Sequence, residues 1–225
     1  MYTSLGRPTE ALEVYDRIMP AVTAKDKAQA AAMLSHVREA ENQIKNATSG
    51  SMALHALDQA ERSLGITVDP PREWRLYRGE ALLKIGDVNS IGEAQNVALS
   101  LLRANRSDPE ALVLRGRSLY AQGENEKAVQ HFKQAHEIDP DYKDAVKYLR
   151  LVQKLERMKE EGNQHFKANK YQQAVSVYSD ALAVDPKNRG TNSKILQNRA
   201  ICYTKVDIAQ LEFKALRQEA DILHS

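Results

Sequence analysis

The chain has 225 residues, of which 28% are charged and 42% hydrophobic, a composition that excludes an intrinsically disordered protein. Its 32 basic and 30 acidic residues leave a net charge of +2 and form no basic block, which argues against a nucleic-acid partner. The single cysteine, Cys202, cannot form a disulfide within the chain, which indicates a reducing compartment.

The first twenty residues contain no apolar stretch of signal-peptide length, and no later segment is apolar enough to span a membrane. We therefore expect a cytoplasmic protein, with the nucleus as a second location and no membrane partner. Ala, Leu, Glu, Lys, Gln and Arg dominate, and no segment alternates apolar and polar residues over the length of a strand. This pattern predicts an all-α fold.

The N-terminal third predicts two helices of one kind, in which small and larger apolar residues recur at a fixed spacing. The first helix carries Ala11 and Tyr15, and the second carries Ala53, Leu57 and Ala60. Almost no helix precedes the first of these. We therefore expect the chain to begin inside a structural repeat whose opening helix is truncated.

A helix–turn–helix pair follows. Residues 78–86 predict its first helix, and residues 93–102, with Ala94 and Ala98 at the same spacing, predict its second. Between the two helices, residues 88–92 (VNSIG) predict a lengthened turn.

Two later segments align with each other without a gap. They are GRSLYAQGENEKAVQHFKQAHEIDP, residues 116–140, and GNQHFKANKYQQAVSVYSDALAVDP, residues 162–186. Each places glycine, a turn, alanine, an aromatic residue, alanine and Asp-Pro at the same distances. The pattern resembles the tetratricopeptide repeat (TPR), a helix–turn–helix unit, and Ala94 and Ala128 lie one 34-residue TPR period apart.

The pattern also has a physical interpretation. Gly116 or Gly162, with the alanines of the second helix, lets two antiparallel helices approach closely, and Phe132 or Tyr178 fills the space beside that contact. The Asp-Pro pair ends the second helix because proline cannot continue it. One helix pair cannot bury its apolar stripe alone, so repeats must stack, and the resemblance implies a right-handed TPR solenoid.

Residues 142–167 predict one unbroken helix, because Leu151, Leu155, Met158 and Gly162 lie on one apolar stripe. This helix is longer than the first helix of an ordinary repeat. We therefore expect a continuous superhelix with one lengthened joint.

We expect three parts: an N-terminal TPR block at residues 1–140, a long joining helix at residues 141–157 that continues into the next repeat, and a C-terminal clamp-type block at residues 158–225. In the last block, residues 193–205 predict a further first helix. Residues 206–225 are amphipathic but lose the repeat spacing. Three placements stay open for them: the second helix of the repeat, a cap on the solenoid, or a helix that reflects only where the chain was cut.

Two short segments resemble the motif of a TPR subset that binds the extreme C-terminus of cytosolic chaperones through a carboxylate clamp. They are KEEGN, residues 159–163, and NRA, residues 198–200. The resemblance implies that Lys159 donates a charge-assisted hydrogen bond to a carboxylate and that Asn163 and Asn198 donate through their amides. The candidate peptide-binding residues are Lys159, Asn163, Phe166, Lys167, Asn198 and Lys205.

The order of the repeats resembles the TPR region of a J-domain co-chaperone with two TPR clusters, although no His-Pro-Asp tripeptide of a J domain occurs. The resemblance implies the acidic C-terminal tail of Hsp70 or Hsp90 as a partner and a client protein as a second one. The family clamp also uses a lysine and an arginine from a third first helix, beyond Ser225, so we expect weak tail binding by this chain. We also expect self-association through exposed solenoid ends.

Two functions stay open: a co-chaperone adaptor with a partial clamp, or a TPR scaffold in another assembly whose Lys159 and Asn163 are merely surface residues. No phosphate loop, HExxH or paired-cysteine motif occurs, so we expect no enzyme, cofactor or metal. His131 and His136 lie off the one-turn spacing of a chelating helix and predict interhelical or surface contacts. Cys202 lies on an apolar stripe, which predicts an inert, buried thiol.

Overall fold

The computed structural model describes residues 2–17, 23–46, 49–65 and 67–223, with side chains up to residue 208 and at residue 210. Every regular element in these ranges is helical, so the prediction of an all-α fold is confirmed for them. After a short 3₁₀ helix, Thr3–Leu5, come α1 (Pro8–Tyr15), α2 (Ala24–Lys45), α3 (Gly50–Glu61), α4 (Arg72–Ile85), α5 (Val88–Ala104), α6 (Pro109–Ala121), α7 (Asn125–Ile138), α8 (Lys143–Lys167), α9 (Tyr171–Val184) and α10 (Arg189–Leu223).

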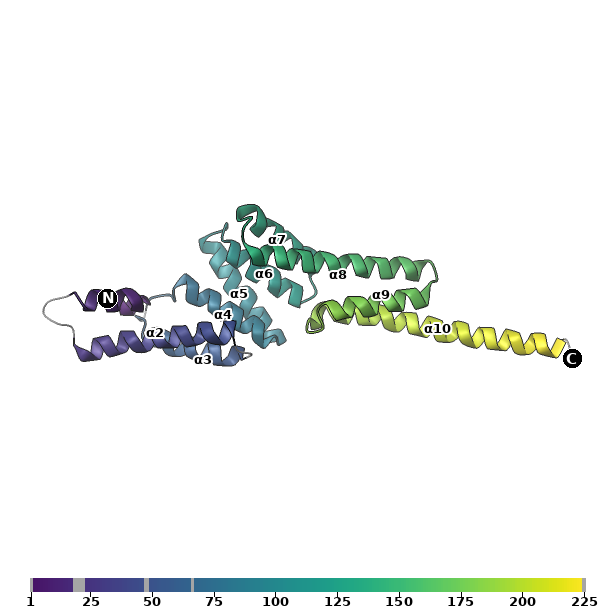
Figure 1. Cartoon of the computed structure of the whole chain (residues 1–225), viewed down its shortest axis with the longest axis horizontal. Coiled ribbons are helices and arrows are strands. Elements are labelled where there is room, and N and C mark those ends of the chain that lie inside the picture. The colour runs from purple at the N-terminus through teal and green to yellow at the C-terminus, as the bar shows by residue number, and fades with distance from the viewer. Residues whose placement is uncertain (1, 18–22, 47–48, 66, 224–225) are drawn as a thin grey trace.

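Successive helices form hairpins that stack into one elongated solenoid. Helices α2 and α3, α4 and α5, α6 and α7, and α8 and α9 pair, and each pair packs on the next (Figure 1). The alanines at the repeat positions are fully buried between the helices: Ala11, Ala53, Ala60, Ala94, Ala98, Ala128, Ala135, Ala174 and Ala181. Within the described ranges, no helix combines the length and the apolar character needed to cross a membrane.

Gly116 and Gly162 mark the closest approach within their helix pairs. A Cβ atom added at Gly116 would lie 2.5 Å from the ring of Phe132, and one added at Gly162 would overlap the ring of Tyr178 in the same way. Both rings are buried and cannot move aside without disturbing the core. The packing role that the sequence predicts for these glycines is confirmed.

The turns inside these two pairs are built alike. Gly123 and Asn169 occupy the same repeat position, and both adopt the left-handed backbone conformation, with φ of 77° and 57°. Glycine does so without strain, and asparagine is one of the few other residues that tolerates it. Helices α7 and α9 end directly before Asp139 and Asp185, as the Asp-Pro pairs predict.

The predicted turn at residues 88–92 is wrong, because α5 already begins at Val88. The side chain of Asp87 caps this helix, and its Oδ1 accepts hydrogen bonds from the backbone amides of Asn89 and Ser90 at 2.9 and 3.0 Å. An aspartate in this position stabilises a helix start. The capping signal therefore outweighs the turn-like composition of the segment.

Two helices are longer than a repeat requires. The predicted unbroken helix is present as α8, which runs for 25 residues from Lys143 to Lys167. Helix α10 runs for 35 residues, and Figure 1 shows its C-terminal part continuing beyond the ends of α8 and α9. No turn interrupts α10 before Leu223, so residues 206–223 do not fold back as the second helix of a repeat.

Polar contacts hold the start of α10 against the end of α6. The Asn188 side-chain amide and the Thr191 hydroxyl both donate to the backbone carbonyl of Tyr120, at 3.1 and 3.3 Å. Lys194 Nζ donates to the carbonyl of Gly123 at 2.7 Å. The Tyr120 carbonyl also accepts from the backbone amide of Gly123 at 3.0 Å, so the α10 side chains add further donors to carbonyls at and beyond the helix C-terminus. We call this set of contacts the α6–α10 joint.

Ion pairs connect α4 to α6 in the N-terminal half. Arg72 binds Asp108 at 2.6 Å, and Arg117 binds Glu80, also at 2.6 Å. Asp108 is buried and caps α6 through the amide of Ala111. Although burial opposes the charged form, the hydrogen bonds from Arg72 and Ala111 hold the pKa of Asp108 below its usual value.

Two glycine substitutions test this packing, and they should change the free energy of unfolding in opposite directions. Gly162→Ala should lower the free energy of unfolding by about 1–3 kcal/mol, because the added methyl group overpacks the contact with Tyr178. Gly92→Ala is the matched control: it lies inside α5 with no atom within 4 Å of the added Cβ, so it should raise stability by about 0.5–1 kcal/mol. Urea denaturation measures both, and a stabilising Gly162→Ala would contradict the packing described.

Candidate functional site

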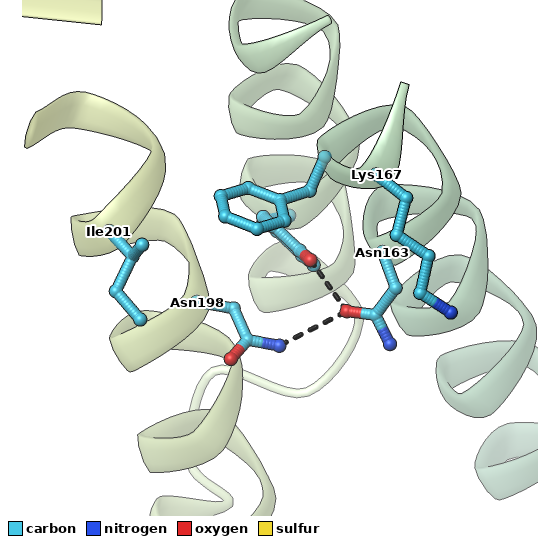
Figure 2. A pocket seen from close by; sticks show the side chains of 6 residues that line it. Asn163, Lys167, Asn198 and Ile201 are labelled. Carbon is cyan, nitrogen blue, oxygen red and sulfur yellow. Dashed lines mark hydrogen bonds between the residues drawn. The ribbon is translucent and has the colours of Figure 1, made fainter. Parts of the chain in front are cut away.

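A small cavity of about 150 Å³ opens between α8, α9 and α10 (Figure 2). We call it the α8–α10 cavity. Its lining residues are Asn163, Phe166 and Lys167 from α8, Tyr178 from α9, and Asn198 and Ile201 from α10. The structure thus brings together four of the six candidate residues, and the other two, Lys159 and Lys205, do not line this cavity.

Asn163 lies at the centre of the polar contacts in the cavity. Its Oδ1 accepts hydrogen bonds from the Tyr178 hydroxyl at 2.6 Å and from Asn198 Nδ2 at 3.2 Å (Figure 2). Two donors on the same oxygen fix which way the amide faces. Asn163 Nδ2 therefore points away from them, and its single contact among the described residues is a long one, 3.4 Å, to Glu160.

Burial keeps the hydroxyl of Tyr178 in its donating form. Only 1% of this residue is exposed, and burial raises the pKa of its hydroxyl above the ordinary value. A protonated hydroxyl keeps the hydrogen that it donates to the side-chain oxygen of Asn163. This hydrogen bond therefore persists across the physiological pH range.

Lys159 lies one helical turn before Asn163 but faces a different space. Its Nζ forms an ion pair with Glu156 at 2.5 Å, and both side chains are partly buried, at 27% and 29% exposed. A second cavity, of about 240 Å³ beside the start of α7, is lined by both residues together with Lys194. The ion pair draws Lys159 toward the preceding turn of α8 and away from Asn163.

The two remaining lysines differ in their position. Lys167 is exposed at the rim of the α8–α10 cavity and has no ion-pair or hydrogen-bond partner among the described residues. Lys205 is also exposed and lies farther along α10. Of these two, Lys167 alone can present its charge to a molecule inside the cavity.

The apolar side of the cavity consists of Phe166, Ile201 and the ring of Tyr178. Phe166 is held edge-on against Tyr171, with 5.5 Å between the ring centroids, while Ile201 is 49% exposed. Sequence reasoning did not select Ile201 or the Tyr178 hydroxyl. The signal for the hydroxyl was present, because the aligned repeat carries phenylalanine, Phe132, in the same slot.

The other predicted side chains have structural surroundings. Cys202 is fully buried, and burial raises the pKa of its thiol, as expected of an unreactive cysteine. His131 accepts a hydrogen bond from Arg115 at 3.0 Å between α6 and α7. Burial, with the charge of Arg115, lowers the pKa of His131, which favours the neutral imidazole that accepts this hydrogen bond. The prediction of an interhelical contact for His131 is confirmed.

Comparison with known proteins agrees with this architecture. The tetratricopeptide repeat family model matches residues 109–142. The chain is 41% identical over 187 residues to the DnaJ homolog subfamily C member 7 homolog of Schizosaccharomyces pombe, covering 82% of this chain and 38% of that protein. It is 27% identical over 112 residues to the Hsp70-Hsp90 organizing protein of Triticum aestivum, covering 50% of this chain and 18% of that protein.

A solved structure has the same fold. The crystal structure of the P58(IPK) TPR domain superposes with a TM-score of 0.54 and 17% sequence identity, over 98% of this chain and 62% of that chain. The stacked helix pairs, the family match and this likeness define the class: the chain is a tetratricopeptide repeat protein and forms a right-handed TPR solenoid.

Within that class the chain resembles the TPR region of DnaJ homolog subfamily C member 7, a J-domain co-chaperone, and spans about two fifths (38%) of the length of the yeast relative. TPR repeats are protein-interaction modules and not enzymes, so the chain is one of these modules.

The Tyr178–Asn163 hydrogen bond can be tested by removing the hydroxyl alone. Tyr178→Phe should lower the free energy of unfolding by about 1 kcal/mol, because a partly buried amide oxygen loses a donor. Tyr171→Phe is the control, since its hydroxyl bonds Asn169 at the surface, and it should change stability by less than about 0.5 kcal/mol. Thermal or urea unfolding measures both, and equal effects would contradict the contact.

Proposed function

We propose that this chain is the interaction module of a co-chaperone and that the α8–α10 cavity receives the acidic C-terminal tail of Hsp70 or Hsp90 through a partial carboxylate clamp. The similarity to DnaJ homolog subfamily C member 7 supports a co-chaperone, and the wheat relative, the Hsp70-Hsp90 organizing protein, is named for both chaperones. The proposed place of action is the cytoplasm, with the nucleus as a second location. Client proteins are a second proposed class of partner.

The orientation of Asn163 is the observation that carries this proposal. Its oxygen is occupied by two donors, so its Nδ2 group is left as a donor beside the cavity. A carboxylate only accepts hydrogen bonds and therefore fits this group. Asn198 uses one hydrogen of its amide on Asn163, and the second hydrogen is available to the same ligand.

Two lysines would supply positive charge to a bound carboxylate. Lys167 is exposed at the cavity rim and free to donate a charge-assisted hydrogen bond. Lys159 first has to leave Glu156, so its contribution to binding is reduced by the loss of that ion pair. Glu156 thus acts as a competitor of the tail for Lys159.

The apolar wall would select the residue that precedes the terminal carboxylate. Phe166, Ile201 and Tyr178 enclose the inner part of a cavity of about 150 Å³. A space of this volume accommodates a single side chain. Acidic residues farther along the tail would remain near solvent, where screening by salt limits their contribution.

A matched pair of acidic octapeptides tests the clamp, one with a free C-terminal carboxylate and the other with a C-terminal amide. Only the free acid should bind. Asn163→Ala should weaken its binding about tenfold to a hundredfold, the cost of a hydrogen bond to a charged group. Gln164→Ala removes an exposed amide from the neighbouring position of α8 and should leave affinity unchanged. Calorimetric titration measures the binding of both peptides to the unaltered chain and of the free-acid peptide to the two variants. Tight binding of the amidated peptide would refute the clamp.

The competition by Glu156 makes a separate prediction. Glu156→Gln keeps an oxygen for the hydrogen bond from Asn125 but removes the charge that holds Lys159. The affinity for the free-acid peptide should therefore rise about two- to tenfold, and it should become more dependent on salt, because Lys159 then adds an ionic contact with the peptide. The same titration at low and high ionic strength measures this change. Weaker binding by Glu156→Gln would show that Lys159 does not take part.

A further inference from the structure

The exposed side of α8 carries five basic residues in a single line. They are Lys143, Lys147, Arg150, Lys154 and Arg157, and all five are exposed. Their spacing of four, three, four and three residues places them within an arc of about 80° on a helix that turns 100° per residue. No acidic residue lies on this arc between the first and the last of them. We call this line the basic stripe.

The basic stripe is not neutralised within the molecule. None of its five members forms an ion pair with any residue that the structure describes, and Lys147 makes a cation–π contact with the ring of Tyr148, with Nζ 5.3 Å from the ring centroid. Like charges one turn apart destabilise a helix. The stripe therefore lowers the stability of the free chain, and a partner of opposite charge would relieve the repulsion.

A groove lies beside the stripe, between α7 and α8. Its volume is about 1110 Å³, and Arg150, Lys154 and Arg157 line it together with Lys133 of α7. Val129 lies on the α7 side and adds apolar surface to the lining. A groove between two helices, with basic walls and an apolar element, has the form that accepts a third helix.

The stripe and the α8–α10 cavity lie on opposite sides of the same helix. Counting 100° per residue from Lys143, Asn163 lies at about 200° and Lys159 at about 160°. A ligand in the groove would therefore leave the cavity open. The stripe is a second surface, and it does not depend on the proposed tail binding.

We propose that the groove between α7 and α8 binds an acidic amphipathic helix of another protein. The stripe spans 15 residues, or about 21 Å from the first to the last, which matches about four turns of a partner helix whose carboxylates repeat every three or four residues. Specificity comes from the match of the two spacings, because ordinary acidic chains carry their charges on all sides.

The groove suits a peptide better than a nucleic acid. Glu126 and Glu156 also line it, and their carboxylates would repel a phosphate backbone while pairing with a basic residue of a protein partner. Val129 is apolar and would make no favourable contact with a phosphate group. The net charge of +2 is too small for the general electrostatic attraction on which nucleic-acid binding depends.

The test uses a fluorescein-labelled, Ala/Glu-based peptide of about twenty residues with glutamates at the spacing of the stripe. Its C-terminus is amidated, so the clamp cannot hold it. A scrambled peptide of the same composition spreads the glutamates around the helix, and a duplex DNA of about the same length is the third probe. Fluorescence anisotropy at low salt should show the patterned peptide binding at least about fivefold tighter than the scrambled one. The DNA should bind more weakly than either.

Charge reversal locates the binding. The double variant Arg150→Glu with Lys154→Glu should weaken binding of the patterned peptide at least about tenfold. The control, Arg103→Glu with Arg106→Glu, makes an equal change of charge on exposed residues of α5 and the turn that follows it, and should alter this binding less than about twofold. Circular dichroism checks that both remain helical, and the milder Arg150→Gln with Lys154→Gln serves if the reversal unfolds the chain. Asn163→Ala should have no effect.

Three results would overturn the proposal: equal binding of the two peptides, equal effects of the two double reversals, or tighter binding of the DNA than of the patterned peptide. The last result would reassign the stripe to nucleic acid. Because the peptide lacks a terminal carboxylate, failure here leaves the clamp untouched, and failure of the clamp leaves this test valid.

Discussion

The contact between the first turn of α10 and the last turn of α6 determines where the candidate site forms. Gly190 comes so close to α6 that a Cβ atom on it would overlap the backbone of Ala121 and Gln122. The α6–α10 joint adds hydrogen bonds to carbonyls at the end of α6, between residues 68 to 71 positions apart. It fixes the level at which α10 runs along α9, and so brings Asn198 within 3.2 Å of Asn163. A shift of one turn, about 5.4 Å, would separate the two amides.

Much of the fold can be predicted from the sequence because each repeat places the same packing contacts at the same spacing. Gly116 with Phe132, and Gly162 with Tyr178, are close contacts at a constant spacing, so one aligned pair of segments predicts both. The Asp-Pro ends and the long α8 follow from equally local rules. The start of α5 was missed because a single side chain, Asp87, supplies the cap and turns a loop-like segment into helix.

The site was predictable only in part. Asn163 and Asn198 could be paired because they lie at matching positions of adjacent repeats. The ion pair of Lys159 with Glu156, within one helix, depends on the conformation that the lysine side chain adopts, and the repeat pattern does not specify that conformation. The α6–α10 joint joins side chains to backbone groups distant in sequence, so it has no periodic signature. Its signal, the polar segment from Asn188 to Lys194, resembles an ordinary loop followed by a helix start.

Helix α8 makes three kinds of contact and uses two opposite sides for them. One side packs in the solenoid through Val152 and Leu155 and, nearer the C-terminus of the helix, contributes Asn163 and Lys167 to the α8–α10 cavity; the opposite side carries the basic stripe. A rigid helix with two separate polar surfaces would let one repeat hold two partners at once, which is the arrangement that an adaptor needs.

The most direct test of the proposed clamp follows the side-chain amides themselves. In a two-dimensional ¹H–¹⁵N NMR titration, the NH₂ resonances of Asn163 and Asn198, assigned by single Asn→Ala variants, should move on addition of an acidic peptide with a free C-terminus. They should stay in place when the amidated peptide is added, because the amide cannot replace the terminal carboxylate. Resonances that move alike with both peptides, or with neither while binding is seen elsewhere, would contradict the account.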